Sequence, residues 1–341
     1  MTRPPRVSLA IPVYNGERYL AAAIDSLLAQ TFTDFELIIT DNASTDATQD
    51  ICSDYARRDP RIRYIRNKRN LGAAGNFNLG FARASGKYFK WCAHDDFISP
   101  NYLEQAVRCL EARPEAVVAF GRLQGVDSEG VLTRYVERGL PGFSQMSPAR
   151  RFRTLLDAHG LDGAIFGVYQ RKMLARTSLH APYYGSDCAL LAELALLGDF
   201  AMVPEITLYN RDHPRRSVNI HSRERLAWQN PNAAGKNPFE LTNRIRHLFA
   251  IAYRHRASVP LYKSMPQLIA WAANPLLVGR CTLEFVGALS PSLRTKLRAV
   301  GLGVIGWISP KQNTRSARSS DALAREKSAI PRRAPPTGAS Q

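Results

Sequence analysis

The chain has 341 residues, of which 45% are hydrophobic and 22% charged, a composition that excludes a fibrous or wholly disordered protein. Its length exceeds the usual size of one hydrophobic core, so we expect one large domain with an extension. The formal net charge of +17 would attract phosphate-bearing partners such as nucleotides, anionic lipids or nucleic acid. No zinc-finger spacing, RNP-like run or helix-turn-helix pattern is present, so no nucleic-acid partner is predicted, and a nucleic-acid-binding protein remains a compositional alternative only.

Short buried runs alternate with helical spacing along the first 120 residues. Four strands are predicted there, at residues 7–11, 35–40, 62–65 and 88–93. The apolar residues between and after them recur at helical spacing through residues 20–28, 51–55, 77–81 and 103–110. This alternation predicts an α/β fold with a mainly parallel sheet covered by helices on both faces.

The alternation of predicted strands and helices is less regular after about residue 120. We predict a fifth strand at 116–120, a hairpin within 123–136, a strand at 164–169, a helix at 187–197 and extended segments near 200–209. The α/β domain is therefore expected to cover residues 1–225.

The C-terminal third is rich in Leu, Val, Ala and Trp, but charged residues interrupt every window long enough to span a bilayer. We expect a helical extension over residues 226–308. Its helices would lie in the membrane interface, as apolar segments flanked by cations do, or pack on the catalytic domain. Residues 309–341 carry an excess of Lys and Arg among Ser, Ala and Pro, which predicts a basic disordered tail.

The cysteines and the N-terminal segment indicate where the protein works. Five scattered cysteines without a C-x-x-C pair favour a reduced, cytoplasmic setting. The apolar run that begins at Val7 breaks at Pro12, which is too short for a signal peptide. We expect a protein that is not secreted.

Polar residues follow the predicted strands where each one ends. They are Tyr14 and Asn15, Asp41 and Asn42, Asn70, and Asp95 and Asp96. Taken singly, each is an ordinary turn or cap former. Ligands bind at the carboxyl ends of strands in open parallel sheets, so together these residues predict a ligand site. No phosphate-binding loop and no G-x-G-x-x-G run is present, which argues against an NTPase and a dinucleotide dehydrogenase.

Five ordered segments carry a resemblance to a known family. They are IPVYN at 11–15, DNASTDAT at 41–48, NLG at 70–72, ASGKY at 84–88 and DDFISP at 95–100. Over about the first 120 residues the chain resembles the family 2 glycosyltransferases of GT-A fold. This resemblance implies a Rossmann-like GT-A domain that transfers sugar from a nucleoside-diphosphate sugar.

The resemblance also implies roles for individual residues. Asp41 would accept hydrogen bonds from a uracil-like edge, which favours a UDP-sugar. Pro12 and Tyr14 would line the base pocket. The full nucleotide-sugar site would comprise Pro12, Tyr14, Asn15, Asp41, Asn70 and Asp95.

A divalent cation is part of the same expectation. Asp95 stands where the family holds the cation against the diphosphate, with Asp96 beside it, and oxygen ligands of this kind suit Mg²⁺ or Mn²⁺. The family often has Asp-x-Asp-Asp, whereas Ala93 replaces the first acidic residue here. His94 would contact the nucleotide or be an ordinary turn residue.

Downstream, residues 209–213 resemble the family's Tyr-Arg-x-His segment. His213 would complete the metal shell or touch the diphosphate. Arg211, Arg215 and Arg216 would screen phosphate charge, or else form a solvated basic loop.

Asp187 matches the position of the family's catalytic base, at the start of a leucine-rich helix. The alternative is that Asp187 only caps this helix. Glu193, further along this helix, is the next candidate for the base. The Gln-x-x-Arg-Trp signature of processive synthases is absent, which favours addition of single sugars.

These patterns predict an inverting transferase that moves one sugar to a hydroxyl of a glycan or lipid-linked acceptor in cell-surface polysaccharide synthesis. It would be cytoplasmic, either free or peripheral on the inner face of the cell membrane. The alternative is a non-catalytic nucleotide-sugar binding module. Two departures from the family pattern favour it: Ala93 replaces the first acidic residue of Asp-x-Asp-Asp, and Ser186 replaces the Glu that commonly precedes the base.

Overall fold

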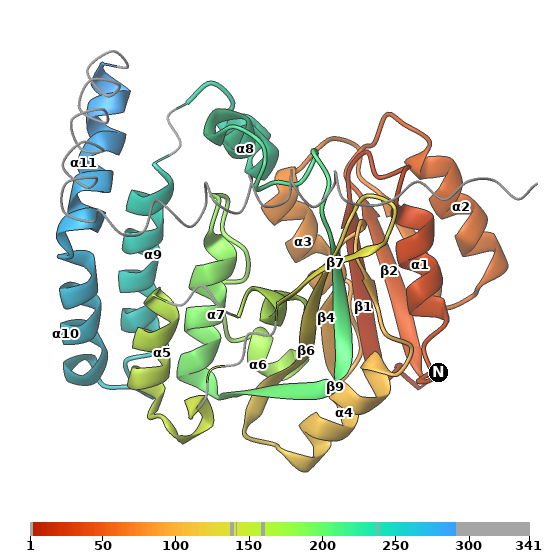
Figure 1. Ribbon diagram of the computed structural model, residues 1–341, viewed down its shortest axis with the longest axis horizontal. Coiled ribbons are helices and arrows are strands. Elements are labelled where there is room, and N and C mark those ends of the chain that lie inside the picture. Colours follow the sequence, from red (N-terminus) through yellow and green to blue (C-terminus); the bar gives the residue numbers. More distant parts are fainter. Residues whose placement is uncertain (1–2, 137–139, 141, 158–160, 237–238, 291–341) are drawn as a thin grey trace, which may run out of the picture. The chain divides into compact units, whose positions relative to one another are not determined.

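The computed structural model describes residues 3–136, 140, 142–157, 161–236 and 239–290 (Figure 1). The chain divides into two compact units, Met1–Glu284 and Phe285–Gln341. All the strands of the described residues lie in the first unit. The predicted disordered tail at residues 309–341 lies outside the described residues.

The N-terminal half of the sheet is parallel, as predicted. Its strands run in the order β3 (Ile62–Arg66), β2 (Phe35–Asp41), β1 (Val7–Val13) and β4 (Tyr88–Trp91). Every residue of β1, β2 and β4 is buried, which explains their nearly continuous apolar sequences. The connecting helices are α1 (Leu20–Leu28), α2 (Thr48–Arg58) and α3 (Gly72–Ala82).

The second half makes the sheet mixed. It contains β5 (Phe97–Ile98), β6 (Ala116–Val126), β7 (Leu132–Val136), β8 (Val168–Gln170) and β9 (Asp199–Arg211), with α4 (Tyr102–Ala112) before β6. β8 lies antiparallel between β4 and β6, and β9 runs parallel to β6. The antiparallel β6–β7 pair confirms the predicted hairpin. The predicted α/β class is confirmed.

The strand predicted at 164–169 is corrected in part. Residues Asp162–Phe166 form a 3₁₀ turn, and only Val168–Gln170 is extended. The turn closes through a hydrogen bond from Gly167 N to Ala164 O of 3.0 Å. A Cβ at Gly167 would come within 2.5 Å of Val118, so the close approach of this turn to β6 requires glycine.

The other regular elements of the described chain are helices and 3₁₀ turns. They are α5 (Pro148–Asp157), α6 (Arg171–Leu174), α7 (Ser186–Leu197), α8 (Ser222–Gln229), α9 (Glu240–Arg254), α10 (Leu261–Ala272) and α11 (Pro275–Leu289), with 3₁₀ turns at Phe143–Gln145 and Pro231–Ala233. The predicted helix at 187–197 is confirmed. Among the described residues, no helix is both long and apolar enough to cross a membrane.

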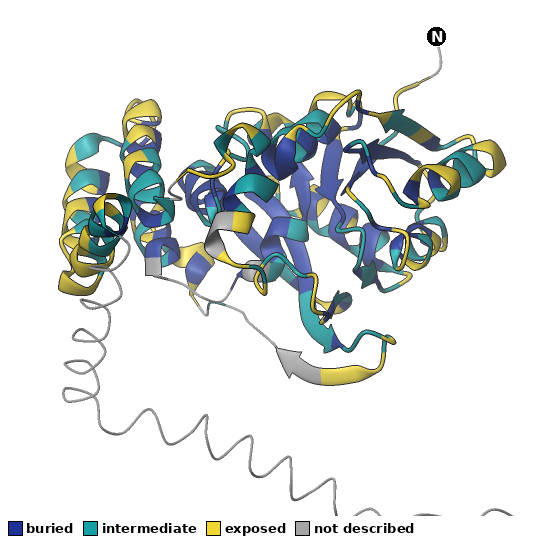
Figure 2. Cartoon of the chain, turned by 90° about the horizontal axis from the view of Figure 1, so that it is seen from above, coloured by how far each residue is buried: buried dark blue, intermediate teal, exposed yellow. Residues whose placement is uncertain are grey.

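Buried side chains form two clusters, and the dark blue of Figure 2 is concentrated in the strands. One cluster joins Trp91 of the sheet to Leu194 of α7, Leu248 of α9 and Leu268 of α10. Helices α9 and α10 therefore pack within the same compact unit as the sheet, which extends to Glu284. The functional division at residue 225 and the contact of these helices with a membrane stay predictions.

Candidate active site

The loop after β1 is held to the loop after β2 by hydrogen bonds. Asn15 has a backbone φ of 52°, a left-handed conformation that asparagine tolerates better than most residues. Its N–H donates to Ser44 Oγ at 3.0 Å, and its Oδ1 accepts from Thr45 N at 2.9 Å. Pro12 is buried in β1, while Tyr14 is 39% exposed. The structure thus brings three predicted site residues to one strand end.

Asp41 is fully buried at the end of β2, and both of its oxygens have partners within the chain. Oδ1 accepts from Ser44 N at 2.8 Å, and Oδ2 accepts from the Tyr64 hydroxyl at 2.7 Å. Arg66 Nε lies 3.3 Å from Oδ2. A carboxylate can accept about four hydrogen bonds, so this one is nearly saturated. Its contact with a base stays a prediction.

Asparagine side chains join the strand ends to α3. Asn70 Oδ1 accepts from Asn42 Nδ2 at 2.7 Å, and Asn67 Nδ2 donates to Asn76 Oδ1 at 3.0 Å. Asn76 also donates to Thr40 O at 2.7 Å. Asn67 and Asn76 were not predicted as site residues, although a buried amide on an otherwise apolar helix is a usable signal. The contact of Asn70 with a nucleotide stays a prediction.

Asp95 and His213 come together although 118 residues separate them in sequence. His213 Nε2 lies 2.9 Å from Asp95 Oδ2, and the two side chains are 6% and 18% exposed. Burial alone would raise the pKa of Asp95, but His94 and the hydrogen bond with His213 lower it to about 2. Asp95 is therefore an ionised carboxylate at neutral pH.

Asp96 has different surroundings. Burial, and then the charge of Asp95, raise the pKa of Asp96 to about 7. Its carboxylate accepts from Asn210 Nδ2 at 3.2 and 3.1 Å and from Arg211 N at 2.9 Å. These bonds fasten the end of β9 to the turn after β4. The metal-ligand role of Asp96 stays a prediction.

The donor set suits a divalent cation that is shared with a substrate. Asp95 supplies carboxylate oxygen and His213 an imidazole nitrogen, and Mg²⁺ is commonly held by one or two carboxylates plus substrate phosphates. No cluster of three or more His, Cys, Asp or Glu residues that could hold a metal occurs in the described part of the chain. Phosphate oxygens would have to complete the shell.

The arginines of this region differ in how far they are engaged. Arg211 is buried, its guanidinium lies 4.8 Å from the Tyr19 ring centroid, and its Nη1 donates to Ser128 O at 2.9 Å. Arg216 donates to Asn210 Oδ1 at 2.8 Å. Arg211 and Arg216 therefore hold the end of β9, whereas Arg215 is exposed. Phosphate screening by the three stays a prediction.

Asp187 is the second residue of α7, not its N-cap. The N-cap is Gly185, at φ 87°, and Asp187 Oδ1 accepts from Cys188 N at 2.9 Å. A carboxylate in the first turn is favoured by the helix dipole. Glu193 is fully buried and bonded to Ser178, Arg254 and His255, so it is not placed to act as a base.

A chain of contacts connects the start of α7 to the strand ends. Tyr184 lies under Arg225 of α8, whose guanidinium is 4.0 Å from the ring centroid. A Cβ on Gly72, the first residue of α3, would come within 2.3 Å of Gln229 O at the end of α8. Figure 1 shows α3 and α8 beside each other at the upper edge. The base candidate and the strand ends are thus joined through α8.

Residues 8–179 match the family model described as glycosyl transferase family 2, which is half of the chain. The chain belongs to glycosyl transferase family 2. An uncharacterized glycosyltransferase from Haemophilus influenzae is 27% identical over 66% of this chain and 71% of its own length. Another from Rickettsia felis is 35% identical over 39% of this chain, but only 22% of its own length is covered.

Solved structures share the fold of this family 2 enzyme. The crystal structure of TarS residues 1–349 from S. aureus, in complex with UDP-GlcNAc, has a TM-score of 0.50. It is 17% identical and covers 87% of this chain and 92% of its own. The sequence resemblance to GT-A glycosyltransferases is therefore confirmed for both family and fold.

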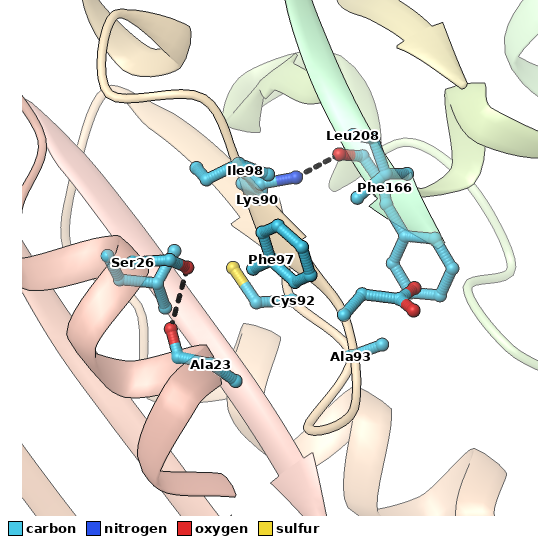
Figure 3. A pocket seen from close by; sticks show the side chains of 11 residues that line it. Ala23, Ser26, Lys90, Cys92, Ala93, Phe97, Ile98, Phe166 and Leu208 are labelled. Carbon is cyan, nitrogen blue, oxygen red and sulfur yellow. Dashed lines mark hydrogen bonds between the residues drawn. The ribbon is translucent and has the colours of Figure 1, made fainter. Parts of the chain in front are cut away.

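A small cavity lies beside β4 of this glycosyltransferase. Its volume is about 10 Å³, and Lys90, Cys92 and Phe97 are among its lining residues (Figure 3). Lys90 is buried and donates to Phe166 O. Pockets for small molecules usually measure hundreds of Å³, so this cavity has room for a water molecule but not for a nucleotide.

Proposed function

We propose that this family 2 enzyme is an inverting glycosyltransferase that moves one sugar from a nucleoside-diphosphate sugar to a hydroxyl of a glycan or lipid-linked acceptor. The observation that carries this proposal is the ionised Asp95 paired with His213 at the edge where the strands end. A donor diphosphate needs such a place, where a cation can be held between protein and phosphate. The crystal structures of TarS with UDP-GlcNAc and with UDP favour a UDP-sugar as the donor.

Asp95 and His213 would hold Mg²⁺ or Mn²⁺ together with the donor's phosphates. A cation bound there would offset the charge that develops on the departing nucleoside diphosphate. Pro12, Tyr14, Asn15, Asp41 and Asn70 would surround the nucleotide.

Asp187 would act as the general base. Its carboxylate takes the proton from the acceptor hydroxyl while the oxygen attacks the anomeric carbon. The bond to the diphosphate breaks on the opposite face, so the configuration inverts and no covalent enzyme intermediate forms.

The acceptor would be met at the cytoplasmic face of the cell membrane, in cell-surface polysaccharide synthesis. Exposed apolar residues on α10 and α11 support a peripheral contact, since Tyr262, Ile269 and Leu276 are 74%, 54% and 63% exposed. Lys263 follows Tyr262 and Arg280 follows Leu276 in sequence, and both would favour anionic lipid.

The test is a panel of nucleoside-diphosphate sugars incubated with Mg²⁺ or Mn²⁺ and a set of glycan and lipid-linked acceptors. We expect one donor to be consumed, with release of its nucleoside diphosphate and a product of inverted anomeric configuration by NMR. Retention of configuration would overturn the single-displacement mechanism. Tight donor binding without any turnover across the panel would support the non-catalytic binding module instead.

A further inference from the structure

A groove of about 410 Å³ lies between the segment before α7 and the helix α9. Its walls are Ala181–Tyr183 on one side and Asn243, Arg246, His247 and Ala250 of α9 on the other. Helices α7 and α9 run side by side in Figure 1. The residues named here as lining it include apolar surface and a cation but no carboxylate.

A relay of hydrogen bonds fixes the groove wall. Ionised Glu193 can only accept, so the Ser178 hydroxyl donates to its Oε2 at 2.5 Å. Ser178 Oγ must then accept from His247 Nε2 at 2.9 Å. Burial lowers the pKa of His247 and keeps the ring neutral, so its Nδ1 accepts from the Tyr183 hydroxyl at 2.9 Å.

This relay commits the proton of Tyr183 to the protein interior. Tyr183 is only 6% exposed, yet it lines the groove, and its oxygen can still accept a hydrogen bond from a ligand hydroxyl. Across the groove, Arg246 is exposed, and its Nη2 donates a long hydrogen bond of 3.5 Å to Asn243 Oδ1. The groove therefore offers an acceptor for a hydroxyl and a forked donor for an anion.

The groove lies close to the proposed base. Tyr183 lies four residues before Asp187, in the segment that leads into α7. A ligand that contacts Tyr183 would thus lie near the residue proposed to take a proton from the acceptor.

We infer that this groove binds the acceptor through a phosphorylated sugar unit, with Arg246 on the phosphate and Tyr183 on a sugar hydroxyl. This inference rests on the proposed function, which places the acceptor hydroxyl at Asp187. It names a substrate class, an anionic glycan, for a site that is separate from the Asp95–His213 pair.

The experiment uses the full chain with ¹³C-labelled alanine methyl groups, because Ala181 and Ala250 line the groove and report on its occupancy. Glucose 6-phosphate is the probe, with glucose and inorganic phosphate as matched halves of it. We expect saturable shifts of both methyl signals with glucose 6-phosphate, and binding about tenfold weaker or worse for either half.

Arg246→Gln should weaken binding of glucose 6-phosphate about tenfold. Arg256→Gln removes the same charge from an exposed position outside the groove and should leave binding unchanged. Unshifted alanine signals, equal binding by Arg246→Gln, or inorganic phosphate binding as tightly as the probe would overturn the inference. UDP binding, measured on the same samples, reports on the donor site and shows separately whether the proposed function fails.

Discussion

Asp187 has a position in which a catalytic role can be separated from a structural one. Because Gly185 is the N-cap, replacing Asp187 with Asn removes a charge from the first turn without removing a cap. We expect Asp187→Asn to retain UDP affinity and melting temperature while transfer falls by ~10²- to 10⁴-fold. Steady-state rates and calorimetry measure the two effects.

Asp50→Asn is the charge-matched control, since Asp50 is an exposed carboxylate in the first turn of another helix, α2. Its turnover should stay within a few-fold of the native enzyme. If Asp187→Asn behaved in the same way, Asp187 would not be the base.

His180 links acidity to stability. Its ring packs 4.7 Å from the Trp91 centroid and 4.9 Å from that of Phe77, and its buried Nε2 has no hydrogen-bond partner among the described residues. Burial lowers its pKa from 6.5 to about 4. Between these values the unfolded chain binds a proton that the folded ring does not, so stability is full above pH 6.5 and is lost as the pH falls toward 4.

We therefore expect His180→Phe to reduce the loss of stability between about pH 7.5 and about pH 5 by roughly 1 kcal/mol or more. Urea unfolding at both pH values, for the native chain and the variant, measures the difference. Identical losses in the two proteins would show that His180 does not titrate across folding.

At the scale of elements, regular patterning explains what could be predicted. Fully buried strands such as β1 and β2 have mostly apolar sequences, and the helix α1 between them keeps a clear apolar face. The two-residue strand β5 is too short to show a pattern. The 3₁₀ turn at 162–166 depends on the approach of Gly167 to β6, a tertiary contact that local sequence does not encode.

In the candidate site, too, sequence motifs predicted some contacts, whereas others depend on tertiary structure. Motif order pointed to Asp95 and His213, which the fold brings into contact. Sequence spacing could not show that Asp96 bonds to Asn210 and Arg211, because that partner strand lies more than a hundred residues away. Nor could it show that Asp41 would accept hydrogen bonds from Tyr64 and Ser44.

The asparagine network provides a prediction at the element scale. Asn76 is 2% exposed and joins α3 to β2 through Thr40 O and to Asn67. Asn76→Leu should destabilise the fold by about 2–4 kcal/mol, because these buried partners lose their hydrogen bonds. Asn232→Leu, at an exposed position, should change the free energy of unfolding by less than about 0.5 kcal/mol. Similar values for both variants would argue against a structural network.

At the scale of the whole molecule, the charge of +17 and the exposed apolar residues of α10 and α11 support the proposed membrane contact. We expect the combined variant Tyr262→Ser, Ile269→Ser and Leu276→Ser to lose binding to vesicles containing phosphatidylglycerol while remaining folded. Binding by the native chain should weaken as salt is raised.

Leu268→Ala is the matched test of packing, since Leu268 is fully buried on α10, the helix that carries Tyr262 and Ile269. It should cost about 2–5 kcal/mol of stability and leave vesicle binding intact below its melting temperature. Removing the chain after residue 255 would delete this core residue and Trp271, so truncation would unfold the protein before it reported on membranes. Vesicle binding unchanged in the triple variant would exclude this surface as the contact.

The most direct test of the proposed donor site is calorimetric titration of UDP into the full chain. The titration is done with Mn²⁺ and after chelation, for the native protein and for Asp95→Asn. The ionised Asp95 beside His213 is the feature on which the donor site depends. We predict that UDP binds the native chain only when Mn²⁺ is present and that Asp95→Asn weakens this binding at least about tenfold. UDP binding that is unaffected by both chelation and the substitution would contradict it.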